Sequence, residues 1–343
     1  MDTASAKIIH LPAGVQQERP ATQEGGAAGQ APEKKEDVIP PSPELVPQTV
    51  REASPSDFFT SLAECGIKEE RLRAERTRVL GEISALRAEN RWEDILALFH
   101  PVEARLPELD ALGLATPVRA EAAFALGHIG RHDEAIELYT RCIAEEPDNF
   151  HYHSGLAYAA YDTLYAAKGR QLMLHPAERR ARIELAHRHF AVAQSLRPDR
   201  VTNYYRQGML FKKIQGKSPE ALPCFETAVR NWEAYSPEDK KARHQERKNY
   251  VKSLYQLASC LLDAQKPQPA LAALTRCIAE DEESGYFSAV HKYFALGKVH
   301  FERGDPDQAL HALHFAAAQA SPEDDDYVFE LLARVHLCRG DTE

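Results

Sequence analysis

The chain has 343 residues, of which 43% are apolar and 27% charged, and its formal net charge is -10. The acidic balance argues against a general nucleic-acid binder, and no apolar run is long enough for a membrane span or a signal peptide. Aromatic residues are few, whereas Ala, Leu, Glu and Arg are frequent, which favours helices over sheet. We therefore expect a helical protein of the cytoplasm.

The first 55 residues differ in composition from the rest of the chain. They are rich in Pro, Gly, Gln, Glu and Ala, as in the run Pro40-Pro41-Ser42-Pro43. So little apolar surface cannot offset the entropy lost on ordering, and residues 1–55 are predicted to be a disordered tail. Ordered structure is expected from Ser56, the N-cap of a short helix that would end at Gly66.

From Lys68 onward, apolar residues recur with a period close to 3.6, interrupted every few turns by Gly, Asn or Pro. The hexapeptide Thr140-Arg141-Cys142-Ile143-Ala144-Glu145 recurs letter for letter as Thr275-Arg276-Cys277-Ile278-Ala279-Glu280. Such repetition predicts a stack of similar helical units, each of which contacts mainly its neighbours.

The repeated units share a spacing of small and large residues. A small residue is followed by a large apolar residue four positions later and by another small residue three further on. This pattern begins at Ala135, Ala186, Ala221, Ala270 and Ala309. A helix bearing Gly or Ala, such as Gly155, Gly208, Ala258 or Gly297, accompanies these segments. Small residues let two helix axes approach, and the large residue fills the adjacent groove.

This register resembles the tetratricopeptide repeat, a unit of two helices and about 34 residues. The resemblance covers roughly residues 78–340. It implies an all-α, right-handed α-solenoid of about six helix-turn-helix units within a repeat domain at 56–343. Two helical insertions are expected, near residues 162–180 and 232–249. The first would consist of extended helices meeting at His175-Pro176, and the second would begin at Ser236 and continue as one long helix to Leu262.

The sequence shows no constellation of catalytic residues. It lacks a nucleophile elbow, a phosphate-binding Gly-rich loop, a His-Glu-x-x-His motif and a Cys-x-x-Cys pair. Its 15 histidines are interpreted as solvated or capping residues, and its six cysteines as free thiols in a reducing compartment. We therefore expect neither a metal nor a cofactor, and no enzymatic activity.

In this family the first helices of the units line a concave groove. The residue three positions before each Gly or Ala is then Tyr152, Tyr205, Tyr255 and Phe294. Neighbouring columns bring in Met209, Lys212, Lys213, Lys252 and Lys298. These nine residues are the predicted peptide-binding groove, and the lysines would favour an acidic ligand. The alternative is that the rings only fill space between neighbouring helices.

Three functions follow as hypotheses. The leading one is a non-catalytic adaptor or scaffold that binds a peptide segment of a partner protein. A second is a regulatory or substrate-recruiting domain of a larger enzyme, because Arg339-Gly340-Asp341 matches the turn at Arg303-Gly304-Asp305 and the chain stops where another helix is expected. The third is self-association through the inserted helices.

Overall fold

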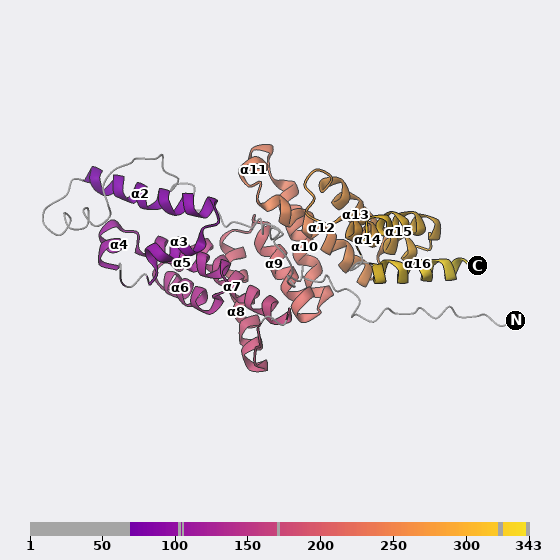
Figure 1. Cartoon of the computed structure of the whole chain (residues 1–343), viewed down its shortest axis with the longest axis horizontal. Helices are drawn as coiled ribbons and strands as arrows, with labels where there is room; N and C mark the ends of the chain where they lie inside the picture. Colours follow the sequence, from indigo (N-terminus) through magenta and orange to yellow (C-terminus); the bar gives the residue numbers. More distant parts are fainter. Residues whose placement is uncertain (1–68, 102–103, 105, 170–171, 322–324, 341–343) are drawn as a thin grey trace. The chain divides into compact units, whose positions relative to one another are not determined.

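The computed structural model describes residues 69–101, 104, 106–169, 172–321 and 325–340 (Figure 1). Within these residues the backbone forms helices joined by turns and contains no strand. The expected all-α class is therefore confirmed. The predicted tail and the short helix expected after Ser56 lie outside the described residues.

The described helices are α2 (Glu69–Ala88), α3 (Trp92–Phe99), α4 (Leu106–Leu112), α5 (Ala115–His128), α6 (His132–Glu145), α7 (Phe150–Lys168), α8 (Pro176–Leu196), α9 (Thr202–Met209), the π-helical η3 (Leu210–Ile214), α10 (Ser218–Ala234), α11 (Pro237–Ala242), α12 (Glu246–Asp263), α13 (Pro267–Glu280), α14 (Ala289–Glu302), α15 (Pro306–Gln319) and α16 (Asp325–Arg339).

The described helices divide into two compact units, one that ends at Cys260 and one that begins at Leu261. In the first unit, each helix from α5 to α10 packs against the next in the chain, and α5 also touches α7. In the second unit, α13, α14, α15 and α16 pack in the same serial way, and α14 also touches α16. Serial packing of helix pairs is the solenoid construction that the repeats predicted.

The five small-x3-large-x2-small segments form the core of these pairs. All fifteen side chains are at most 5% exposed: Ala135, Tyr139, Cys142, Ala186, Phe190, Ala193, Ala221, Phe225, Ala228, Ala270, Leu274, Cys277, Ala309, Leu313 and Ala316. Within the repeated hexapeptide, Cys142 and Cys277 occupy the same buried position in two units.

Glycine is required where the neighbouring helix supplies a large core residue. A Cβ atom on Gly208 of α9 would lie 2.7 Å from Cε1 of Phe225 on α10, and one on Gly297 of α14 would lie 2.5 Å from Cγ of Leu313 on α15. On α7, a Cβ at Gly155 would overlap the ring of Tyr139 on α6. These three contacts bear out the predicted close approach of helix axes.

The two predicted insertions differ from expectation in their details. Helix α8 begins at Pro176 with His175 as its N-cap, but α7 already ends at Lys168, so the two helices do not meet at His175-Pro176. The second segment starts as predicted, since the Ser236 hydroxyl accepts a hydrogen bond from Asp239 N. The single long helix is wrong, however, because α11 ends at Ala242 and α12 begins at Glu246.

Long-range contacts explain this break between α11 and α12. The Arg243 guanidinium donates to Asp199 at 2.7 Å and lies 4.7 Å from the centre of the Tyr235 ring. The buried Glu246 carboxylate pairs with Arg200 at 2.6 Å and accepts from Val201 N at 2.7 Å. Both ends of the break are thus held to the turn between α8 and α9, which a continuous helix could not achieve.

Candidate functional site

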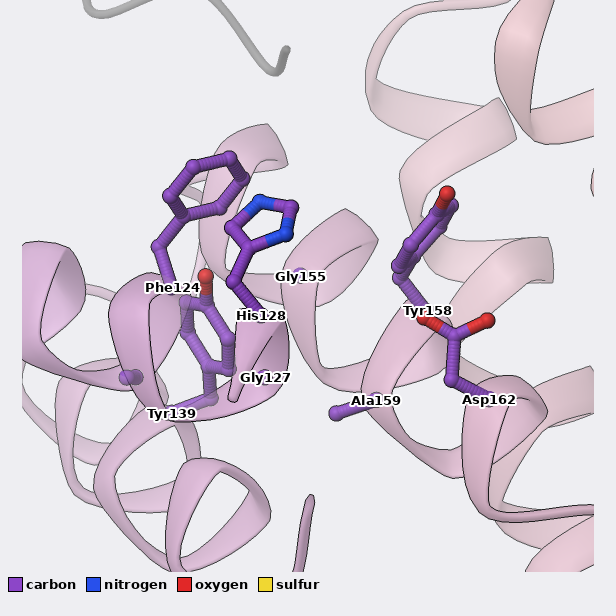
Figure 2. Close-up of a pocket in the computed structure, with 9 residues that line it drawn as sticks. Phe124, Gly127, His128, Tyr139, Gly155, Tyr158, Ala159 and Asp162 are labelled. Atoms are coloured by element: carbon purple, nitrogen blue, oxygen red, sulfur yellow. The ribbon is translucent and has the colours of Figure 1, made fainter. Parts of the chain in front are cut away.

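A pocket opens between α5 and α7 because both helices present small residues there. Ala123 and Gly127 lie one turn apart on α5, and Gly155 and Ala159 lie one turn apart on α7. A larger side chain at Gly127 would extend into open space, whereas the space beside Gly155 is occupied by the Tyr139 ring. Tyr139 of α6 also lines the pocket, which has a volume of about 380 Å³ when its open mouth is included (Figure 2). We call this the α5–α7 pocket.

The side walls of the α5–α7 pocket combine aromatic and polar groups. Phe124 and His128 come from α5, and Tyr158 and Asp162 come from α7, on the opposite side in Figure 2. The His128 ring is stacked on buried Trp92 at 4.3 Å between centroids, and Phe124 meets His128 edge-on at the same distance. These ring contacts fix the α5 wall before any ligand arrives.

Two arginines stack on rings of the walls. The Arg87 guanidinium lies 4.1 Å from the centre of the Phe124 ring and pairs with Glu121 at 3.0 Å. The Arg206 guanidinium lies 4.3 Å from the Tyr158 ring centre and donates to the Tyr158 hydroxyl. Cation–π contacts of this kind restrict ring motion and add positive charge next to the pocket.

This arrangement is suited to binding rather than to covalent chemistry. The lining offers an apolar base, ring faces and one carboxylate, which together accommodate an apolar or aromatic side chain. Burial raises the pKa of Tyr139, so its hydroxyl stays protonated. Across the part of the chain that the structure describes, no three His, Cys, Asp or Glu side chains cluster as a metal site would need.

The structure buries four of the nine predicted groove residues. Tyr152 belongs to the core around α5, α6 and α7, whereas Tyr205 and Met209 belong to the core that contains Phe190 and Phe225. Lys212 is also buried, and its ammonium lies 3.4 Å from the Gln256 carbonyl oxygen. These four side chains present little surface to a ligand. For Tyr152 and Tyr205 this agrees with the alternative that the rings only fill space between neighbouring helices.

The other five predicted residues are half-buried. Lys213, Lys252 and Tyr255 lie in the first unit. Phe294 and Lys298 lie on α14 in the second unit, where the Phe294 ring meets that of Tyr327 edge-on at 4.7 Å. Whether these residues bind a peptide stays a prediction.

Sequence reasoning misses the residues that line the α5–α7 pocket. It does not single out Tyr158 as a binding residue, and it interprets His128, like the other histidines, as a solvated or capping residue. The sequence does contain one signal: two pairs of small residues, each spaced by one helical turn, namely Ala123 with Gly127 and Gly155 with Ala159. Finding the pocket from the sequence would require knowing that α5 and α7 lie side by side.

The histidines also depart from the sequence interpretation. His153 is buried, and its Nδ1 lies 2.8 Å from Nδ1 of His189, 36 residues away. Its Nε2 lies 2.8 Å from the Pro147 carbonyl oxygen, which can only accept, so Nε2 donates this hydrogen bond. The two rings are stacked 5.0 Å apart between centroids, so they pack against each other rather than standing alone in solvent.

Comparison with known proteins gives three family matches. The models, all described as tetratricopeptide repeat, match residues 118–149, 252–284 and 294–343. No curated protein matches the sequence significantly. No helix among the described residues is long and apolar enough to cross a membrane.

Several solved structures are distantly similar. YrrB, described as a TPR protein with an unusual peptide-binding site, has 14% identity and a TM-score of 0.44, over 62% of this chain and 89% of its own. MamA has 15% identity and a TM-score of 0.43, over 60% of this chain and 91% of its own. A thermophilic TPR protein from Thermus thermophilus has 17% identity and a TM-score of 0.37, over 65% of this chain and 99% of its own. At these values no ligand or partner follows from the similarity.

Proposed function

Because this chain belongs to the tetratricopeptide repeat family, we propose that it is a non-catalytic adaptor that binds a peptide segment of a partner protein. The α5–α7 pocket is the observation that carries the proposal. A preformed pocket between the first helices of two neighbouring units suits one anchoring side chain of an extended peptide.

The lining restricts the chemistry of that anchor. The half-buried Phe124, Gly127 and Tyr158 give the pocket an apolar and aromatic surface, so the anchor is an apolar or aromatic side chain. Asp162 lines the same pocket and disfavours an acidic anchor. The predicted preference for acidic ligands therefore concerns ligand residues that flank the anchor, where the half-buried Arg206 beside Tyr158 supplies positive charge.

Filling the pocket tests this proposal without disturbing the core. A Cβ on Gly127 would meet no atom within 4 Å, so Gly127→Leu adds a side chain to open space. Ala144→Leu is the matched control, because Ala144 is an exposed helical residue of α6 that does not line the pocket. Both variants should remain folded.

The probe is a set of peptides selected from a random displayed library against the full chain. Their affinities for the wild type and both variants are then measured by fluorescence anisotropy. Gly127→Leu should weaken binding at least about tenfold, since it removes the anchor site, whereas Ala144→Leu should leave it unchanged. Peptides that bind both variants equally well would show that the pocket is not the binding site.

We also propose a cellular compartment for the adaptor. The five described cysteines form no disulfide, and Cys142, Cys260 and Cys277 are buried. This supports a reducing compartment, for which the cytoplasm is the simplest assignment.

A further inference from the structure

Helix α16 carries an apolar stripe that is exposed in the second unit. Phe329 is 52% exposed and Leu337 is 68% exposed, and Ala333 lies exposed between them. Residues four and eight positions apart share one face of a helix, so the three form a continuous stripe. The opposite face, with Val328, Leu331 and Val335, is buried against the rest of the unit.

The preceding helix pair shows what normally covers such a face. The sequence Val299-His300-x-x-Arg303-Gly304 of α14 recurs as Val335-His336-x-x-Arg339-Gly340, and both glycines have positive φ, at 74° and 82°. In this register, Phe329, Ala333 and Leu337 correspond to Tyr293, Gly297 and Phe301.

On α14 this face is covered by a second helix. Leu313 of α15 lies against Gly297, and Phe315 of α15 lies 4.1 Å from Tyr293 between ring centroids. The covering helix presents a small residue and, four positions later, a large one, namely Ala309 and Leu313. The stripe on α16 likewise has a small residue, Ala333, between the larger Phe329 and Leu337, so a second helix can approach it at Ala333.

We propose that the occupant is α16 of a second copy of this chain, in antiparallel orientation. Helix α16 itself has the required pattern, since Ala333 is followed by Leu337 four positions later. In an antiparallel pair centred on Ala333, Leu337 of each copy packs against Phe329 of the other.

The charges of α16 match this antiparallel orientation. Its first half carries the exposed Asp326 and Glu330, and its second half carries Arg334 beside the stripe, whereas Arg339 is paired with Asp307 of α15 at 3.0 Å. Antiparallel pairing places each acidic half opposite a basic half, whereas parallel pairing would oppose like charges. One helix pair buries less than a standard interface, so the dimer should be weak and depend on concentration.

Light scattering and sedimentation on the full chain test the proposal. The mass should rise from 38.4 kDa towards twice that value with concentration, and Leu337→Glu should weaken association at least about tenfold. The control is Phe315→Glu, which changes a 44% exposed residue of α15 outside the stripe and should leave association intact. A chain that stays monomeric overturns the proposal. So does a monomer in which Leu337→Glu lowers the melting temperature, because another segment of the same chain would then cover the stripe.

Cross-linking tests the centre of the proposed pair. With Cys65 and Cys338 replaced by serine, Ala333→Cys should form a disulfide-linked dimer under mild oxidation, because residue 333 of each copy faces its counterpart. Ala318→Cys, on an exposed position of α15, should not. Equal cross-linking of both variants, or none at residue 333, would rule out this geometry.

Discussion

Individual glycines decide how closely the helices of this protein pack. Gly155, Gly208 and Gly297 each face a buried large side chain of a neighbouring helix, namely Tyr139, Phe225 and Leu313. Gly127 faces open space, although it too is helical. The same residue type therefore has two roles: it permits contact at three positions and leaves a pocket at the fourth.

Alanine substitutions should separate these two roles. Gly208→Ala should lower the free energy of unfolding by about 1–2 kcal/mol, since overpacking against Phe225 outweighs the gain in helix preference. Gly127→Ala should raise it by about 0.5–1 kcal/mol, because only the gain applies. Urea denaturation of both variants gives the comparison. A neutral Gly208→Ala would mean that α9 and α10 are less close than the structure shows.

At the scale of the element, one turn conformation is repeated between helices. The residue at this turn has positive φ at Asn90, Gly130, Gln265, Gly304 and Gly340. Side chains other than glycine are strained in this region. The turn at Gln265 therefore forms because the flanking helices require it, despite an unfavourable residue.

Substitutions at the turn residues Gln265 and Gly130 should change the free energy of unfolding in opposite directions. Gln265→Gly should raise the free energy of unfolding by about 0.5–1 kcal/mol, because the strain at φ 57° is removed. Gly130→Ala should lower it by about 1 kcal/mol, and purely through the backbone, since no atom lies within 4 Å of its added Cβ. Thermal melts of the two variants test the pair. If both changes have the same sign, backbone strain does not govern these turns.

The elements themselves show what the sequence can and cannot predict. The small-x3-large pattern and the accompanying helices that bear Gly or Ala identify most of the paired helices, because these signals are local. The break before Glu246 depends on Arg200 and Asp199, more than 40 residues away, and no local pattern encodes it. The π-helical η3 is similar: Ala221 follows Gly208 by 13 residues where Ala309 follows Gly297 by 12, and η3 accommodates the extra residue.

The candidate site is less predictable than the fold. The repeat register identifies one aromatic residue per unit for the predicted groove, but it does not indicate whether that ring points outward or into the core. Tyr152 and Tyr205 belong to the core, whereas half-buried Tyr158 lines the pocket. Exposure depends on the sizes of residues on the neighbouring helix, which is a tertiary property.

At the scale of the whole molecule, both units contain half-buried histidines whose pKa values are lowered. Burial lowers the pKa of His151 and of His189 to about 4, helped by Arg200 near the first and by His153 near the second. Burial also lowers the pKa of His187 and, in the second unit, that of His300. Because an unfolded histidine takes up a proton near pH 6.5, unfolding becomes coupled to proton uptake below that value.

The stability of the protein should therefore fall as the pH drops from 6.5 to 4. These pKa values are lowered in the folded state, so the stabilisation is complete above pH 6.5 and is lost progressively down to the folded pKa values. We expect a loss on the order of 3 kcal/mol, roughly half of what fully shielded His151 and His189 rings would give. Urea denaturation at pH 7 and pH 4.5 measures this loss.

The double variant His151→Gln/His189→Gln provides the control for this pH effect. Glutamine does not titrate, so the variant should lose clearly less stability between the two pH values, even if it is less stable at pH 7. Carboxylates with lowered pKa values, such as those of Asp199 and Glu134, act mainly below this window, because their ordinary pKa values are near 4. If wild type and variant lose stability equally, the acid sensitivity comes from groups other than these two rings.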